Sequence, residues 1–124
     1  MQREACLVAV VDDEESVRKA LGRLVRSAGY AVETYGSAVE FMHSLQRHHP
    51  DCVVLDLRMP VVSGLEVQSA IVRSGAAVPV IIITGDDSPE TRERTLRQGA
   101  RAYLRKPVDD TALLEAIQGA IARP

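Results

Sequence analysis

Short apolar runs alternate with longer amphipathic segments along the whole chain. Five runs are rich in Val, Ile, Leu and Ala, and they cover residues 7–11, 31–35, 52–55, 78–83 and 102–104. Four of them are nearly continuous in apolar residues, which is typical of strands buried on both faces. The run 31–35, Ala-Val-Glu-Thr-Tyr, alternates instead. That pattern predicts an edge strand with one face in water.

The first three segments between the runs have helical periodicity. In the first, apolar residues recur at positions 17, 20, 21, 24, 25 and 28, and Gly29 follows as a stop signal. Ser37 with Glu40 predicts a capping box before an apolar stripe at positions 38, 41, 42 and 45. A third helix is expected over residues 65–74, ending at Gly75.

Two more helices are expected in the C-terminal third. Ser88, followed by Pro89, begins the fourth helix, and Gly99 ends it. Asp109 or Asp110 caps the fifth, whose apolar stripe lies at positions 113, 114, 117 and 121. Strands that alternate with helices favour an α/β fold with a parallel sheet covered on both faces. Because crossovers are right-handed, such a sheet is doubly wound.

The composition fits a single domain over residues 1–124. Apolar residues make up 46% of the 124 and charged residues 26%, as in ordinary globular proteins. The net charge of −2 carries no basic excess, so we expect no nucleic-acid binding by this chain alone. The longest apolar runs are far shorter than a membrane span, which takes about 18 residues or more.

The two cysteines are too few for a disulfide scaffold. Cys6 and Cys52 each open an apolar run, so small buried thiols are expected there. The N-terminus has no secretory pattern, because the acids 12–15 follow directly on the small and apolar residues 5–11. We therefore expect a reducing, cytoplasmic setting.

Polar residues follow four of the apolar runs directly, whereas the presumed edge strand leads into a plain Gly36 turn. These residues are Asp12 and Asp13, Asp56, Thr84, and Arg105-Lys106-Pro107. In open parallel sheets, ligands bind beyond the carboxyl ends of the strands. The fold thus predicts three carboxylates, a hydroxyl and an ammonium at one edge of the sheet.

Three neighbouring carboxylates repel one another unless a cation joins them. Oxygen ligands beside open, solvent-filled positions suit Mg²⁺. A carboxylate next to bound Mg²⁺, such as Asp56, can act as a nucleophile toward a phosphoryl group. Lys106 can neutralise phosphoryl oxygens and Thr84 can donate a hydrogen bond to one.

Each of these residues also has an ordinary explanation. Asp12 and Asp13 can cap a helix, and Asp56 can pair with Arg58 or sit in a turn. Thr84 can be a plain strand end, and the Lys106-Pro107 step a loop. Their coincidence at the matching ends of four strands favours the functional interpretation.

The motifs resemble the receiver domain of two-component response regulators, a CheY-like member of the flavodoxin-type folds. They are Val-Val-Asp12-Asp13-Glu, Leu-Asp56-Leu-Arg-Met-Pro-Val-Val-Ser-Gly64, Ile-Ile-Thr84-Gly85 and Tyr103-Leu-Arg-Lys106-Pro107. The resemblance covers essentially the whole chain and is closest to the FixJ-type branch. It implies a five-stranded sheet in the order 2-1-3-4-5.

The resemblance also implies roles for the site residues. Asp12 and Asp13 would hold Mg²⁺ together with Asp56 and the backbone carbonyl of Arg58. Asp56 would accept the phosphoryl group from a histidine kinase or a histidine phosphotransfer protein. Lys106 would pair with the phosphoryl oxygens, and Pro107 would follow a cis peptide bond. Such a module catalyses its own phosphorylation and dephosphorylation and is not an enzyme toward other substrates.

A conformational switch is part of what the resemblance implies. On phosphorylation, Thr84 would move toward the phosphoryl group and Tyr103 would turn inward into the vacated space. The surface of the fourth helix, fifth strand and fifth helix would then change its contacts with an effector domain or a second copy. Taken alone, Tyr103 can equally be an aromatic residue packed on a strand.

The fourth helix has little to bury, since residues 90–98 contain one large apolar residue, Leu96, among Arg92, Arg94 and Arg97. It is either a weakly anchored output element or simply a solvated face. Arg58 and Asp86 are expected to flank the site, to pair across its entrance and to shield the phosphoryl group from water, with Gly85 leaving the site open to a donor protein. The histidines His43, His48 and His49 are not expected to form a metal site or to act as a phosphodonor.

Two other classes of function would use similar residues. A haloacid-dehalogenase-like phosphatase needs a second acid two residues after its nucleophile, and Arg58 stands there. A pseudo-receiver would bind partners without phosphorylation, but every acceptor-site residue type is retained. The chain can also be the N-terminal module of a longer regulator, with an effector domain beyond Pro124.

Overall fold

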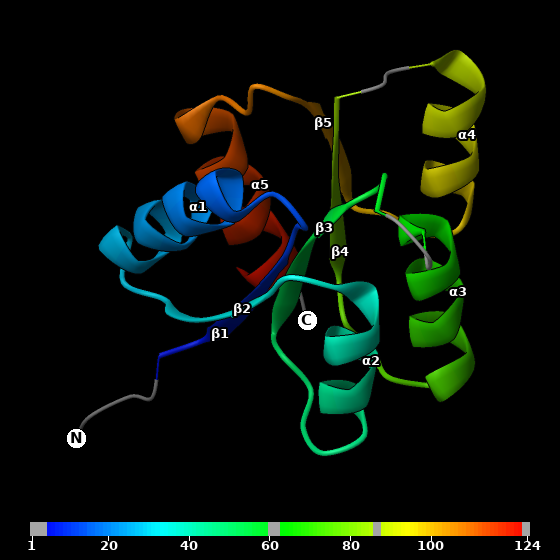
Figure 1. The fold of residues 1–124 in the computed structure, drawn as a ribbon, viewed down its shortest axis with the longest axis horizontal. Helices are drawn as coiled ribbons and strands as arrows, with labels where there is room; N and C mark the ends of the chain where they lie inside the picture. Colours follow the sequence, from blue (N-terminus) through cyan, green and yellow to red (C-terminus); the bar gives the residue numbers. More distant parts are fainter. Residues whose placement is uncertain (1–4, 60–62, 86–87, 123–124) are drawn as a thin grey trace.

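Five strands and five helices alternate through the described part of the chain (Figure 1). The computed structural model describes residues 5–59, 63–85 and 88–122. The strands are β1 (Leu7–Val11), β2 (Ala31–Tyr35), β3 (Cys52–Asp56), β4 (Val80–Thr84) and β5 (Ala102–Arg105). The helices are α1 (Glu15–Ser27), α2 (Ala38–Leu45), α3 (Gly64–Ser74), α4 (Pro89–Arg97) and α5 (Asp110–Ala122).

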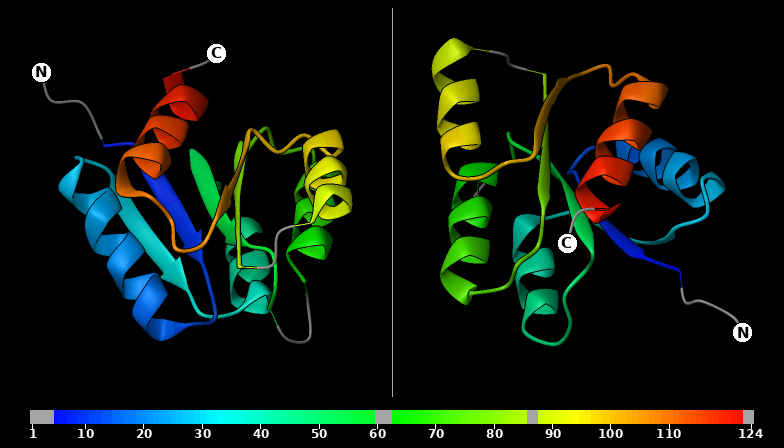
Figure 2. Two further views of the ribbon diagram at one scale, coloured as in Figure 1. Left: turned by 90° about the horizontal axis from the view of Figure 1, so that it is seen from above. Right: turned by 180° about the vertical axis from the view of Figure 1, so that it is seen from behind.

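The strands form one parallel sheet in the order β2-β1-β3-β4-β5, which confirms the expected doubly wound, flavodoxin-like fold. Helices α1 and α5 cover one face, and α2, α3 and α4 cover the other (Figures 1 and 2). Alternate residues of the central strands point into the two cores. For example, Leu55 lies in the same core as Phe41 of α2, whereas Val54 lies in the other core with Leu113 of α5.

The outer strand β5 differs from the expectation of burial on both faces. It is the last strand in the order, and three of its four residues are only partly buried or exposed. Strand β2 lies at the other edge, as its alternating pattern predicted. Strand β4 begins at Val80 and not at Val78, since Pro79 precedes it and has no amide hydrogen for a ladder.

Most of the helix boundaries agree with the expected signals. Gly29, Gly75 and Gly99 all have positive φ, between 78° and 103°, after α1, α3 and α4. Two positions of the first expected apolar stripe are exposed, however: residue 20 on α1 and residue 28, which follows the helix as its C-cap. Asp109 is the residue that caps α5, because its carboxylate accepts from the Ala112 N–H at 2.9 Å.

The complete capping box lies at α3 and not at α2. Ser37 accepts from the Glu40 N–H at 3.2 Å, which is only half of the predicted motif among the described residues. Before α3, Ser63 accepts from the Glu66 N–H at 3.3 Å and the Glu66 carboxylate accepts from the Ser63 N–H at 3.2 Å. This box fixes the start of α3 close to the end of β3.

The start of α3 touches the end of β3 through Gly64. The Gly64 N–H donates to the Leu57 carbonyl at 2.9 Å. A Cβ on Gly64 would lie 2.7 Å from the backbone oxygen of Asp56 and 2.7 Å from the Cα of Leu57. Because both are backbone atoms, the absence of a side chain here lets the helix approach the end of the strand.

None of the helices in the described ranges is both long and apolar enough to cross a bilayer.

We expect Gly64→Ala to destabilise the domain by about 1–3 kcal/mol, because an added methyl group forces the backbone of β3 and α3 apart. Gly119→Ala is the matched control. Its Cβ meets nothing within 4 Å, so the exchange should stabilise α5 by about 0.5–1 kcal/mol. Urea unfolding of both variants measures the difference, and equal stability of the two would contradict this account of the contact.

Candidate functional site

The sequence-predicted site residues meet at the carboxyl edge of the sheet. Asp12 directly follows β1, Asp56 ends β3, and Thr84 ends β4. Strand register aligns Asp56 with Ile83, and Thr84 with Arg105 immediately before Lys106. The Lys106 N–H donates to the Thr84 carbonyl at 2.8 Å, which continues the ladder to the edge.

Three acids form one cluster at this edge. Carboxylate oxygens of Asp12, Asp13 and Asp56 all lie within 4.8 Å of one another. Asp12 is 0% exposed and Asp56 3%, whereas Asp13 is exposed, so solvent reaches the cluster at Asp13. Oδ2 of Asp12 is buried and faces the ammonium group of Lys106 at 2.9 Å. This set of oxygens fits a small divalent cation that keeps some water ligands.

Lys106 is the cation that faces the acids. Its Nζ lies 2.9 Å from Asp12 Oδ2, 3.4 Å from Asp56 Oδ2 and 3.4 Å from Glu14 Oε1. Burial alone would lower the pKa of Lys106, but the carboxylates of Asp12, Asp56 and Glu14 together raise it. Lys106 therefore stays protonated at neutral pH and partly balances the cluster.

The structure destabilises the charged form of the Asp56 carboxyl group. Burial, with the negative Asp12 beside it, raises the pKa of Asp56 to about 6. Lys106 lowers that pKa in part, as does the Arg58 N–H, which donates to Asp56 Oδ1 at 3.2 Å. Lys106 and the Arg58 N–H do not fully offset the effect of burial and of Asp12 on the Asp56 carboxylate. A cation bound beside it would therefore stabilise its charged form.

Backbone groups fix the position of Asp12. Its N–H donates to the Tyr35 carbonyl at 3.1 Å, and its Oδ1 accepts from the Glu14 N–H at 2.9 Å. The sequence pattern had not singled out Glu14 as a site residue. Its signal is the acid that follows Asp12 and Asp13, but its contact with Lys106 spans 92 residues and depends on the fold.

Thr84 and Tyr103, which the family resemblance assigns to a switch, are both buried. Thr84 is fully buried at the end of β4. Tyr103 is already buried here at 9% exposure, and the guanidinium of Arg92 on α4 lies 5.6 Å from its ring centre. The ring of Tyr103 therefore packs between β5 and Arg92 of α4 in this structure. The Lys106–Pro107 peptide bond is cis, as expected.

The expected Arg58–Asp86 pair cannot be followed in full, because Asp86 lies outside the described residues. Arg58 is exposed, two residues beyond Asp56 in the chain. Gly85 is also exposed, and a Cβ there would meet nothing within 4 Å.

The cysteines and His48 lie away from the acidic cluster. Both Cys6 and Cys52 are free thiols, and burial raises the pKa of Cys52 to about 12, which makes it unreactive. His48 Nε2 lies 2.8 Å from Glu33 Oε1, beside the edge strand β2. Neither supplies a second metal centre among the described residues.

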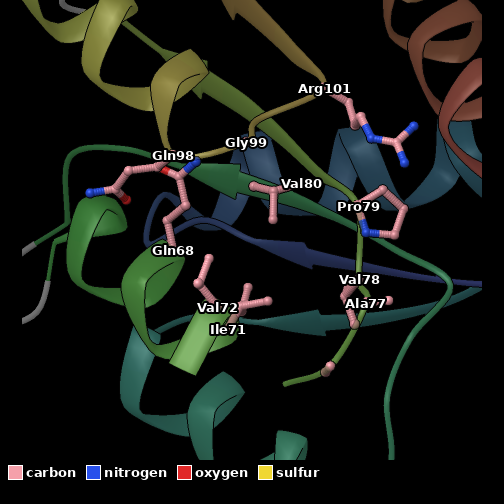
Figure 3. A pocket seen from close by; sticks show the side chains of 11 residues that line it. Gln68, Ile71, Val72, Ala77, Val78, Pro79, Val80, Gln98, Gly99 and Arg101 are labelled. Carbon is pink, nitrogen blue, oxygen red and sulfur yellow. The ribbon is translucent and has the colours of Figure 1, made fainter. Parts of the chain in front are cut away.

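A separate hollow lies at the opposite edge of the sheet, between α3, α4 and the start of β4 (Figure 3). Its lining includes Gln68, Val72, Gln98 and Arg101 and contains no acid, so it does not suit a metal ion. At its upper rim the Gln68 side chain donates to the Thr95 carbonyl at 2.8 Å. This bond ties α4 to α3.

Comparison with known proteins agrees with the fold. Residues 8–118 match the family model of the response regulator receiver domain. The chain belongs to this family, the signalling domain of the response regulators of two-component systems.

Individual relatives point to the same family. The chain is 36% identical to the response regulator protein TodT of Pseudomonas putida over 98% of its own length and 53% of that protein. It is 35% identical to the transcriptional regulatory protein FixJ of Azorhizobium caulinodans, over 97% of the chain and 57% of FixJ. The chain thus spans about half the length of the curated relatives that it matches.

Solved structures show the same fold. A response regulator receiver protein from Burkholderia phymatum superimposes with a TM-score of 0.83 at 44% identity, covering 96% of this chain and 97% of that one. The FixJ-N crystal structure has a TM-score of 0.88 at 34% identity, covering 100% and 98%.

The raised pKa of Asp56 predicts a pH-dependent stability in the absence of divalent metal. The folded-state pKa of about 6 exceeds the ordinary 3.8, so the folded chain binds more protons than the unfolded chain between these values. The free energy of unfolding should therefore fall as the pH rises from 4 to 6, by up to about 3 kcal/mol. Asp56→Asn should remove this fall and be more stable than the wild type at pH 7.

Urea unfolding at pH 4 and pH 7 in chelator measures this effect, with Asp110→Asn as a control that removes an exposed acid. If Asp56→Asn kept the pH dependence of the wild type, the shift would belong to another group.

Proposed function

We propose that this chain is a magnesium-dependent phosphoacceptor switch in which Asp56 receives the phosphoryl group. The observation that carries the proposal is the position of Lys106 Nζ, 2.9 Å from Asp12 and 3.4 Å from Asp56, at the edge of a three-acid cluster. The ammonium group of Lys106 can neutralise phosphoryl oxygens, and the acidic cluster can hold a cation beside its buried member Asp56. Phosphoryl transfer needs both kinds of charge.

In this proposal Asp12, Asp13 and Asp56 hold Mg²⁺ together with the backbone carbonyl of Arg58. When bound, the ion neutralises phosphoryl oxygens and the carboxylates around it. An oxygen of Asp56 attacks the phosphorus of a phosphohistidine, an O–P bond forms and the P–N bond breaks. The imidazole nitrogen leaves with the electron pair of that bond and takes up a proton. The product is an aspartyl phosphate.

Two residues then hold the phosphoryl group. Lys106 exchanges its contacts with Asp12 and Asp56 for a phosphoryl oxygen, a stronger partner because it carries more charge. Thr84 donates its hydroxyl to another oxygen from the neighbouring strand end. The same groups support return of the phosphoryl group to water, so the domain catalyses both halves of its own cycle.

The phosphoryl donor is proposed to be a histidine kinase or a histidine phosphotransfer protein of the cytoplasm. A hollow beside Lys106 offers a place for it, lined by Val17, Leu21 and Leu24 of α1 together with Pro107 and Val108. An apolar surface next to the acceptor suits a helix that carries the donor histidine.

The output surface is proposed to consist of α4, β5 and α5, and to contact an effector domain or a second copy of the chain. Helix α4 has a single fully buried residue, Thr95, and its Leu96 is 40% exposed. The Gln68–Thr95 bond and the Arg92–Tyr103 contact connect it to α3 and β5. An element with so few apolar contacts can be shifted by a small change at Thr84 and Tyr103.

We expect incubation with Mg²⁺ and acetyl phosphate to add one phosphoryl group to the wild type, seen by intact mass. Asp56→Asn should take up none, because the amide is a poor nucleophile. Omission of Mg²⁺ should abolish uptake by the wild type.

The same experiment separates the other classes of function. A folded wild type that stays unmodified, but still binds its partners, would make the chain a pseudo-receiver. Sustained turnover of small phosphoesters would indicate a phosphatase, for which Arg58 stands in place of the second acid.

Hydrogen exchange tests the output element. On phosphorylation we expect the amides of α4 to change protection by several-fold while those of α1, which buries Leu21 and Val25, stay constant. Asp56→Asn treated in the same way is the control. Uniform, strong protection of α4 in both states would contradict a role as the moving element.

A further inference from the structure

Arg18 of α1 reaches across the end of the sheet to the backbone of Asp12. Its Nη1 donates to the Asp12 carbonyl at 2.8 Å, and the side chain is half-buried. The β1–β2 ladder ends here with the bond from the Asp12 N–H to the Tyr35 carbonyl. The guanidinium therefore supplies the partner of the next carbonyl, at a residue that is 0% exposed.

Gly36 leaves room for this guanidinium. It directly follows β2, and a Cβ at this position would lie 3.0 Å from Nη1 and 3.4 Å from Cζ of Arg18. The φ of Gly36 is not in the left-handed region, so a side chain here would disturb the Arg18 guanidinium and not the backbone conformation. Arg18 and Gly36 form a matched pair from two different elements.

We propose that Arg18 is a positioning residue for the metal-binding carboxylate of Asp12, and that Gly36 keeps its guanidinium in place. Three groups of Asp12 each make one hydrogen bond. Its N–H donates to a carbonyl of β2, its carbonyl accepts from Arg18 of α1, and its Oδ1 accepts from the Glu14 N–H. Of these three partners only Arg18 is a side chain. Its bond fixes the peptide that aims Oδ2 at Lys106 and at the acidic cluster. The inference deepens the proposed function, on which it rests.

A purely electrostatic role of Arg18 and a positioning role predict opposite effects of its removal on Mg²⁺ binding. Arg18 carries a positive charge close to a cation site, so its removal should strengthen Mg²⁺ binding if charge were its only contribution. If Arg18 positions Asp12, its removal leaves a buried carbonyl without a partner and a misaligned ligand. Mg²⁺ binding should then become weaker.

The experiment measures the Mg²⁺ dissociation constant of the full chain by NMR titration of backbone amides, without any phosphodonor. We expect Arg18→Met to weaken binding about tenfold, the scale for partners that orient metal ligands. Lys19→Met is the matched control: it removes a positive charge from the next residue of α1, where Lys19 pairs with Glu15 at 3.0 Å and not with Asp12. It should leave binding unchanged or slightly tighter.

Gly36→Ala tests the mechanism while it keeps the arginine. Its methyl group displaces the guanidinium, so Mg²⁺ binding should weaken by a few-fold. In the Arg18→Met background the same exchange should have no further effect, because nothing remains to be displaced. Melting curves confirm that each variant is folded, and Gly36→Ala alone carries the test if Arg18→Met does not fold.

Equal or tighter Mg²⁺ binding by folded Arg18→Met, or additive effects of the two exchanges, would overturn the positioning role. Those outcomes leave the proposed function standing, since the wild type still binds the ion. Failure of the wild type to bind Mg²⁺ would instead remove the proposed function, and this inference with it.

Discussion

The repulsion between the buried carboxylates of Asp12 and Asp56 is the constraint on which the rest of the structure depends. Two negative charges lie at one edge of a sheet with little water around them, and burial raises the pKa of Asp56 to about 6. Lys106 offsets part of this cost from the end of β5. A bound cation would reduce the remaining repulsion between the two carboxylates, and a phosphoryl group would give Lys106 a further partner. Either would thus stabilise this site.

Several contacts hold the scaffold around the carboxylates in place. Parallel strands bring four chain segments to the same edge, and the capping box before α3 with the bare Cα of Gly64 places that helix against the end of β3. Arg18 and Gly36 do the same for the loop after β1. Helix α4, in contrast, has few buried contacts. In the proposed switch, the many contacts around the acids and the few buried contacts of α4 would let a local charge change shift a distant surface.

The fold and the main site residues could be predicted from the sequence because each leaves a local mark. Apolar runs such as 52–55 end in a carboxylate, and glycines with positive φ stand where helices were expected to stop. Predictions failed where neighbours decide the outcome. Strand β5 is apolar but lies at an edge, and the capping box formed at Ser63 and not at Ser37.

The sequence by itself determined the order of elements, the family, and which residue types follow each strand, because periodicity and chain position are local properties. Only the tertiary structure decided that Glu14 approaches Lys106, that Tyr103 is already buried, and that Arg18 reaches Asp12 beside Gly36. These contacts join segments far apart in the chain or on different elements. Their geometry depends on how strands and helices pack, and no local pattern records that packing.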